Sequence, residues 1–524
     1  MANINTAVAP ATEQLYVVPS NDLTATPTAI AGKDNLGFYT PLSVPTQNDG
    51  AGNISGNIPS GLWYATSGDK VNGDHLYYLN LAAGATPSPV QVSNLTLDGS
   101  AATTQCPSNL AQLANLTDAN SGFAILRLAG ADGLCFTSDD QYLLVEAGTS
   151  ASASPTTLPV GGNFAYLGDF YSSPSGQLAG IVGADGNGNL AFYTDQTLAH
   201  ATTLLAGAAG TQYYVLADSS ACAFIVSTTG TVPNSVSKLY RVDRSGAISG
   251  VLYTSQTGGV PGYAVSDQNN LYFADVNSNA GLTNIVQLPL SGATSGVVLY
   301  ADQTSEFGLT LIGSTGTQLV LETWNYPTSS NAGFSNGLIQ TLAVSTANGS
   351  PTTVASVPAG YFLPYGTWLQ SGALYTTQET FGSSGTTASY SAEVLQLNGT
   401  VTSTIANAAW TGVARASASY NIASGATTST LGTLLLAQGI TATDGSYGGG
   451  AMYSSTLSGT ATALQGANGQ AVTVAAGDTI TLNGINATVG VGTMEPSGQA
   501  SAGNPLVEDV FDLSKNLLVQ LNLN

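Results

Sequence analysis

Two stretches of this chain are nearly the same sequence, set 46 residues apart. Ser245–Thr257 returns as Ser291–Thr304, with one residue inserted before a shared Leu-Tyr pair. Each stretch reads as a Ser-Gly turn followed by a short apolar strand. A sequence period of about 20 to 50 residues is typical of solenoids, propellers and other repeat arrays. The repeat therefore restricts the fold more than any other feature of the sequence, although it indicates no activity.

The match extends upstream into the strand before each turn, because Lys238–Gly246 aligns with Asn284–Gly292. The repeating unit is thus strand, Ser-Gly turn, strand, which predicts a β-hairpin. The same pattern recurs at intervals of 46 to 66 residues, and each interval is long enough for one four-stranded sheet with its loops. The anchor residues of these units are Leu76, Tyr142, Leu190, Leu239, Ile285, Ile339, Val394 and Met452.

Elsewhere, apolar runs of four to seven residues alternate with clusters of Gly, Ser, Asn and Thr, which is typical of all-β folds. The one helix candidate is the short segment Ser108–Leu116. We predict an all-β chain, a β-propeller of eight blades, each a four-stranded antiparallel sheet. Seven blades are the alternative, because the first interval is the longest. The Ser-Gly hairpins are expected on the outside of each blade, and runs such as Phe307–Gly313 on the inside.

The ends of the chain differ from the repeats. We predict an N-terminal segment at 1–60, with one strand that closes the ring, and propeller blades at 61–465. Residues 466–524 are predicted to form a polar β-rich insertion followed by C-terminal closing strands. The apolar runs Glu13–Val18 and Leu517–Leu521 are the strands expected to complete one blade together, as the terminal strands of propellers commonly do.

Charge is scarce and mostly negative. Only 7% of the residues are charged, against roughly 25% in an average globular protein, and the net charge is -22. The eight basic residues are scattered, so we expect no binding of nucleic acid or anionic lipid through a basic patch. No run of 18 apolar residues is present, so we expect no membrane span.

In its repeat pattern and its acidic, Lys-poor, Thr/Ser/Gly/Asn-rich composition, the chain resembles bacterial extracytoplasmic β-propeller proteins over about residues 60–500. The Trp-Asp blade ending of WD40 repeats and the kelch pattern are missing, so no family site is carried over. The resemblance implies an extracellular or cell-surface location in a bacterium. The N-terminus lacks the basic and apolar regions of a signal peptide. The signal has therefore been removed, export follows another route, or the chain is cytosolic.

The sharpest local signal for a ligand is an acidic, glycine-containing loop at Gly130–Asp140. Asp132, Asp139 and Asp140 offer three carboxylates within nine residues, and Ca²⁺ prefers such oxygen ligands. EF-hand spacing is not met, and the alternative is a polar turn held by its own hydrogen bonds. No cofactor is required by the fold, and Ca²⁺ is the one metal that the sequence indicates.

The three cysteines contain no CxxC pair, which excludes zinc ribbons and thioredoxin-like sites. Cys106 and Cys135 lie in one loop-rich region, and their spacing permits a disulfide without requiring one. Cys222 lies in an apolar run and is predicted to be a buried, unreactive thiol.

Catalytic patterns are few. Gly333–Gly337 matches the letters G-x-S-x-G, but a nucleophile elbow needs a helix after Ser335 and a histidine base, and a β-like run follows instead. The chain has two histidines, His75 and His200, each in or beside a predicted strand. A propeller could bring several glutamates to one face, where paired carboxylates can cleave glycosides. These glutamates are Glu146, Glu306, Glu322 and Glu379.

From these observations we predict a secreted or cell-surface propeller that acts as a non-enzymatic binding or assembly module, such as a surface-layer, filament or adhesin-like subunit. Its partner would be a protein, a glycan surface or further copies of the chain. The alternative is a propeller-type glycoside hydrolase or lyase that uses carboxylates in the central channel.

Overall fold

The computed structural model of the chain describes a central part in detail and the backbone of strands on either side of it. Within residues 137–421 the described ranges are 137–147, 156–171, 178–208, 210–218, 222–231, 234–267, 269–277, 279–302, 307–325, 335–356, 368–370, 372–381 and 387–421. Outside them, the structure describes the strands given below. The described elements are all β-strands.

Six separate four-stranded antiparallel sheets follow one another along the chain. In each sheet the strands pair in sequence order, so strands that follow one another along the chain are neighbours. The sheets are β7 (Gln105–Leu113), β8 (Gly122–Leu128), β9 (Gln141–Ala147), β10 (Thr156–Thr157); β11 (Ala165–Tyr171), β12 (Leu178–Ala184), β13 (Leu190–Tyr193), β14 (Ala201–Leu205); β15 (Gln212–Asp218), β16 (Cys222–Thr229), β17 (Val236–Asp243), β18 (Tyr253–Thr254); β19 (Val260–Ser266), β20 (Asn270–Asn277), β21 (Leu282–Pro289), β22 (Val297–Asp302); β23 (Phe307–Ser314), β24 (Gln318–Asn325), β25 (Ser335–Ala343), β26 (Thr352–Ser356); β27 (Trp368–Gln370), β28 (Ala373–Phe381), β29 (Thr387–Gln396) and β30 (Val401–Ala406).

The remaining strands form a nine-stranded, a five-stranded and a two-stranded sheet. In the five-stranded sheet, β1 from the N-terminal part pairs in parallel with β40 from the C-terminal part. The nine-stranded sheet contains β3 (Leu36–Asn48), β4 (Asn53–Thr66), β5 (Asp74–Asn80), β6 (Pro89–Leu97), β31 (Ala408–Asn421), β32 (Ala426–Gln438), β35 (Gly450–Thr456), β36 (Thr462–Ala463) and β37 (Thr473–Val474). The others contain β1 (Leu15–Val18), β2 (Thr28–Ala29), β38 (Val491–Met494), β39 (Leu506–Asp512) and β40 (Leu517–Leu523), and β33 (Thr441–Thr443) with β34 (Ser446–Gly448).

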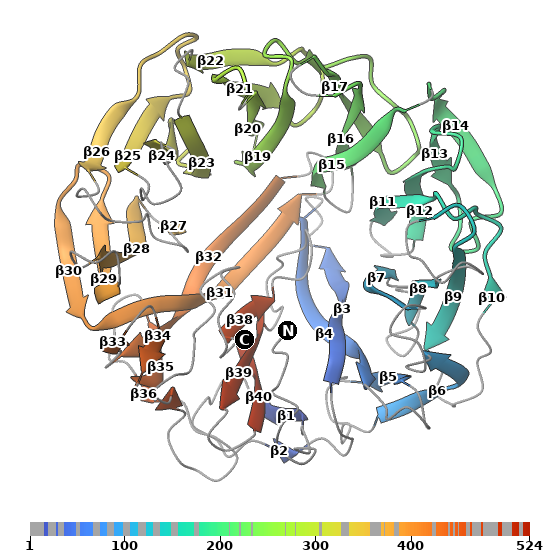
Figure 1. Cartoon of the computed structure of the whole chain (residues 1–524), viewed down its shortest axis with the longest axis horizontal. Coiled ribbons are helices and arrows are strands. Elements are labelled where there is room, and N and C mark those ends of the chain that lie inside the picture. The colour runs from blue at the N-terminus through green and yellow to red at the C-terminus, as the bar shows by residue number, and fades with distance from the viewer. Residues whose placement is uncertain are drawn as a thin grey trace.

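The four-stranded sheets stand around a ring, with the first strand of each on the inside and the fourth on the outside (Figure 1). This arrangement is a β-propeller, and the predicted fold class is confirmed. The number of blades stays a prediction, because β3–β6 share one sheet with β31, β32 and β35–β37 through the pairing of β4 with β31. The division at residues 60 and 465 stays a prediction as well.

The repeated hairpins are the outer hairpins, as the sequence predicts. The first copy forms β17 and β18, the second β21 and β22, and in each pair these are the third and fourth strands of a sheet. The Ser-Gly turn recurs because Gly246 and Gly292 take left-handed backbone angles, with φ of 77° and 67°, which glycine adopts at little cost. The 46-residue period is therefore the distance from one blade to the next.

One prediction about secondary structure is wrong. The segment expected to be a short helix, Ser108–Leu116, overlaps β7, which pairs with β8 through Leu110–Leu113. Sheet pairing with a neighbour outweighs the local helical pattern of so short a segment.

The described core lies between neighbouring sheets, where side chains of one sheet pack against the face of the next. Every described apolar cluster draws its residues from two adjacent sheets. Between the β15–β18 and β19–β22 sheets, for example, Phe224 of β16 shares a cluster with Phe273 of β20. Cys222 in the same cluster is buried and unbridged, as predicted. Because burial of each large side chain contributes about 1.5–3 kcal/mol, these contacts dominate the stability of the ring.

A buried carboxylate also joins these two sheets. Asp275 of β20 is fully buried and accepts hydrogen bonds from the hydroxyl groups of Tyr253 (2.8 Å), Ser255 (2.8 Å) and Thr257 (2.9 Å). It also accepts one from the backbone N–H of Gln256 (3.0 Å). All four donors come from β18 and the loop after it, so the last strand of one blade is held to the second strand of the next. Burial and the nearby carboxylate raise the pKa of Tyr253, which keeps its hydroxyl group a donor.

We expect Asp275→Ala to lower the free energy of unfolding by about 3–5 kcal/mol, because it leaves four donors, two of them buried, without their acceptor. Asp195→Ala is the matched control: Asp195 lies in a solvent-exposed turn, and its loss should cost about 1 kcal/mol or less. Chemical denaturation followed by circular dichroism measures both. Equal effects of the two substitutions would show that the Asp275 contacts add nothing to the junction.

The loop that supplies these donors fits closely on β20. A Cβ atom at Gly259 would lie 1.9 Å from the backbone oxygen of Val276, whereas one at Gly262 meets nothing within 4 Å. We therefore expect Gly259→Ala to lower the melting temperature clearly, because backbone atoms must move to admit the methyl group. Gly262→Ala should leave the melting temperature unchanged within about 2 °C. The contrast fails if both variants melt alike.

Candidate active site between two blades

The apolar contact between the β23–β26 and β27–β30 sheets changes character along its length. Its apolar part is built on Val320, Ile339, Leu374 and Leu395. Side chains two residues apart on a strand point to the same face. Moving two residues along β24, β28 and β29, toward the last residues of β24 and β28, replaces these apolar residues with polar ones. The polar residues at this end are Glu322, Thr376 and Glu393.

Strand pairing confirms that these polar positions share the faces that meet between the two sheets. Glu322 is paired with Ile339 of β25, and Thr376 with Glu393, next to the paired Leu374 and Leu395. We call Glu322, Thr376 and Glu393 the interblade acidic group. Glu322 and Thr376 are buried, and Glu393 is partly buried.

Glu322 is the most unusual member of this group. Its side chain is 5% exposed, and no hydrogen bond or ion pair of its carboxyl group occurs in the described part of the chain. Burial raises the pKa of Glu322 to about 8, and desolvation is the whole cause. At neutral pH this side chain is therefore a neutral carboxylic acid that can give up a proton.

Glu393 differs from Glu322 in its surroundings. Burial also raises the pKa of Glu393, but a hydrogen bond from the Ser391 hydroxyl group (3.4 Å) opposes the shift. It is therefore the more readily ionised of the two carboxyl groups. A pair of carboxyl groups whose environments separate their pKa values is the arrangement from which acid and base roles arise.

An aromatic ring lies beside this group. Trp324 is two residues from Glu322 on β24 and is paired with Gly308 of β23, the inner strand. A Cβ atom at Gly308 would lie 2.2 Å from the indole Nε1 of Trp324, so the indole occupies the space that a side chain at this position would fill. The missing side chain thus lets the indole lie over the inner strand, on the face that carries Glu322.

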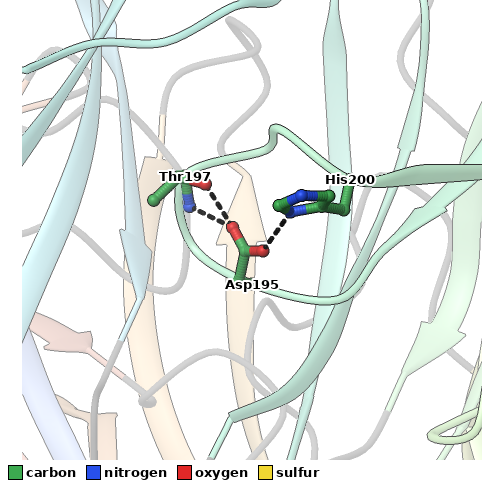
Figure 2. A network of polar contacts seen from close by, with 3 residues as sticks. All are labelled: Asp195, Thr197 and His200. Carbon is green, nitrogen blue, oxygen red and sulfur yellow. Dashed lines mark hydrogen bonds and ion pairs between the residues drawn. The ribbon is translucent and has the colours of Figure 1, made fainter.

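A second polar group, drawn in Figure 2, has the residue types of a catalytic triad but not its setting. In the turn between β13 and β14, Asp195 accepts hydrogen bonds from the hydroxyl and backbone N–H groups of Thr197 and pairs with His200 Nδ1 at 3.0 Å. Partial burial raises the pKa of Asp195, but these hydrogen bonds outweigh it and leave the pKa below its ordinary value. His200 is 77% exposed, so the group is a solvent-exposed turn clasp.

The predicted calcium loop is described only in part. Asp139 and Asp140 lie together, because the Thr137 hydroxyl group is within 2.7 Å of Asp139 Oδ1 and 3.1 Å of Asp140 Oδ1. Asp140 is buried, whereas Asp139 is exposed. The third predicted ligand, Asp132, lies outside the described residues, so the calcium site stays a prediction.

The other predicted site residues fall as follows. The disulfide between Cys106 and Cys135 also stays a prediction: Cys106 lies in β7, its side chain is not described, and Cys135 is outside the described residues. Ser335 begins strand β25, so it lacks the helix of a nucleophile elbow. His75, Glu146 and Glu379 lie in β5, β9 and β28, and Glu306 is outside the described residues. Among the described residues, no helix is long and apolar enough to cross a membrane.

No protein-family model and no curated protein matches the chain significantly. Similar solved structures include oligopeptidase B from Leishmania major (8% identity, TM-score 0.37). The match covers 76% of this chain and 53% of the peptidase. The match to dipeptidyl peptidase 4 from Porphyromonas gingivalis (9% identity, TM-score 0.37) covers 83% of this chain and 59% of the peptidase. The match to an oligogalacturonate lyase in complex with manganese (15% identity, TM-score 0.32) covers 70% of this chain and 93% of the lyase. The chain thus spans little more than half the length of these peptidases.

These structures contradict the prediction of a non-enzymatic binding or assembly module, because they are propeller domains of peptidases and a lyase. Likeness at this level of identity bears on the fold alone.

The raised pKa of Glu322 predicts how stability depends on pH. In the unfolded chain this carboxyl ionises near its ordinary pKa of 4.5, whereas the folded protein keeps the proton up to about pH 8. The contribution of Glu322 to stability is therefore complete below pH 4.5 and is lost progressively as the pH rises to 8. Relative to Glu322→Gln, which cannot ionise, the unmodified protein should lose about 5 kcal/mol over this range.

Denaturation of both proteins at several pH values measures this difference. Any constant effect of the amide cancels, because only the change with pH is compared. Parallel stability curves for the two proteins would contradict a buried, protonated Glu322.

Proposed function

We propose that the chain is a glycoside hydrolase that cleaves a neutral polysaccharide at the interblade acidic group, with Glu322 as the general acid. The observation that supports this proposal most strongly is the buried carboxyl group of Glu322, which retains its proton at neutral pH. Glycoside cleavage needs one protonated carboxyl group to donate to the leaving oxygen and a second carboxylate beside it.

Each residue of the group has a role in this reaction. Glu322 donates its proton to the glycosidic oxygen as the bond from that oxygen to the anomeric carbon breaks. Glu393 in its ionised form either attacks the anomeric carbon or removes a proton from the attacking water. The Trp324 indole offers an apolar face on which one side of a sugar ring can rest.

Charge distinguishes the substrates. A protein of net charge -22 repels a polyanionic substrate such as a polyuronate, because the negative charges of protein and substrate repel each other. A neutral glycan suffers no such repulsion. This difference in charge favours a hydrolase that cleaves a neutral polysaccharide over a lyase that acts by elimination on a uronic acid polymer.

The location of the protein is also a proposal. The low charge and the surface rich in Ser, Thr, Asn and Gly support an extracellular or cell-surface protein. Polysaccharides too large to enter a cell are found there, so the location and the proposed reaction are consistent.

We expect the protein to release reducing sugars from at least one neutral polysaccharide in a panel of β-glucans, xylan, mannan, α-glucans and galactan. Glu322→Gln should lower kcat by about 10²-fold or more, because the leaving oxygen loses its proton donor. His200→Ala is the matched control: it removes a titratable side chain from an exposed turn and should leave kcat unchanged.

Three results would contradict the proposal. Glu322→Gln could retain full activity, the panel could yield no reducing sugar, or polyuronate could yield unsaturated products that absorb in the ultraviolet. The last result would assign the chain to the lyases. Because Glu322→Gln is expected to be at least as stable as the unmodified protein at neutral pH, loss of activity in this variant cannot be attributed to unfolding.

A further inference from the structure

Tyr263 has a backbone conformation that its surroundings do not explain. Its φ is 52°, in the left-handed region that costs about 1–2 kcal/mol for residues other than glycine, asparagine and aspartate. Among the described residues, three other non-glycine residues have positive φ. Asn348 and Asn407 tolerate this conformation, and Leu198 is repaid by a side chain that is buried in an apolar cluster. The side chain of Tyr263, in contrast, is 57% exposed.

The strain arises at a bulge of β19, the inner strand of its sheet. The pairing of β19 with β20 jumps from Gly262 to Val265, so Tyr263 and Ala264 have no partner on β20. The inner strands of the neighbouring described sheets also bulge, but each skips a single residue, and these residues are apolar and at least partly buried. They are Leu167 of β11, Leu216 of β15 and Ile312 of β23.

The surroundings of Tyr263 hold the bulge and leave space beside it. The Tyr214 hydroxyl group donates a hydrogen bond to the backbone oxygen of Pro261 (2.8 Å), which ties the neighbouring inner strand β15 to the residues before the bulge. A Cβ atom at Gly262 would meet nothing within 4 Å. The Tyr263 hydroxyl group makes no hydrogen bond in the described part of the chain.

From this combination we propose that Tyr263 is a sugar-binding subsite on the inner wall of the ring, where its ring supports a pyranose unit of the neutral glycan. β19 is the inner strand of its sheet and contacts the neighbouring inner strands β15 and β23, so Tyr263 lies on a strand that lines the inside of the ring (Figure 1). An exposed aromatic ring with an unpaired hydroxyl group and free space beside it suits a ligand that has an apolar face and hydroxyl groups.

This inference rests on the proposed function, and it adds a binding position away from the site of cleavage. β19 and β23 are adjacent inner strands, and Gly308 of β23 is covered by Trp324 of β24. The interblade acidic group lies on the face of the β23–β26 sheet that points away from β19, toward the β27–β30 sheet. The subsite therefore binds glycan units that extend from the site of cleavage across the inner edge of the β23–β26 sheet. Backbone strain that is kept at a functional position in this way is known in binding sites.

Two measurements test the subsite. In the first, binding of neutral hexasaccharides (cellohexaose, xylohexaose, mannohexaose and maltohexaose) is measured by calorimetry with Glu322→Gln protein, which is expected to leave the sugars intact. Adding Tyr263→Ala should weaken the binding of the best hexasaccharide about tenfold or more, as for an aromatic anchor, and Tyr263→Phe should largely preserve it. In the second, kcat/KM of Tyr263→Ala should fall for the hexasaccharide but not for the 4-nitrophenyl glycoside of the same sugar.

A stability control separates loss of binding from damage to the fold. Tyr263→Gly should melt at or above the temperature of the unmodified protein, because glycine adopts the left-handed conformation without strain, and should lose binding as Tyr263→Ala does. Equal hexasaccharide affinity with and without Tyr263, or no binding of any hexasaccharide, overturns the subsite. Binding that depends on Tyr263 without any hydrolysis would overturn the proposed function and leave the subsite standing.

Discussion

The packing of each four-stranded sheet against the next is the interaction on which this ring depends. A sheet with a neighbouring sheet on each face buries both sides of its second and third strands, as in β20 and β21. The described apolar clusters all lie at these junctions. A polar side chain on one of these faces must therefore find partners there or lower the stability of the junction.

Asp275 and Glu322 show the two outcomes. Asp275 accepts four hydrogen bonds from the neighbouring blade, so its burial joins the sheets. Glu322 lies in the second junction along the ring from that of Asp275. Its carboxyl group has no such donor among the described residues, and it keeps its proton instead of ionising. A group that costs stability and has no structural partner is a candidate for function, which is why the chemistry was assigned to Glu322 and not to Asp275.

Much of the architecture follows from the sequence because it is built on local patterns. The 46-residue repeat places β17 with β21, and the glycine of the Ser-Gly turn is needed for its left-handed φ. The site was less predictable. Glu322 was recognised as one of several scattered glutamates, but which face of β24 it occupies depends on strand register, and its burial depends on the next blade. The strain at Tyr263 leaves no mark in the sequence, because tyrosine is common in strands. The short helix at Ser108–Leu116 was wrong because pairing with β8 decided its conformation.

The junction between the β23–β26 and β27–β30 sheets is expected to hold a neutral carboxylic acid at Glu322. Infrared difference spectroscopy of the unmodified protein against Glu322→Gln observes this directly through the carbonyl stretch of a protonated carboxyl group. We expect such a band at pH 6 to 7, absent in Glu322→Gln, that disappears as the pH passes about 8. Complete ionisation of Glu322 at pH 6 would contradict this expectation.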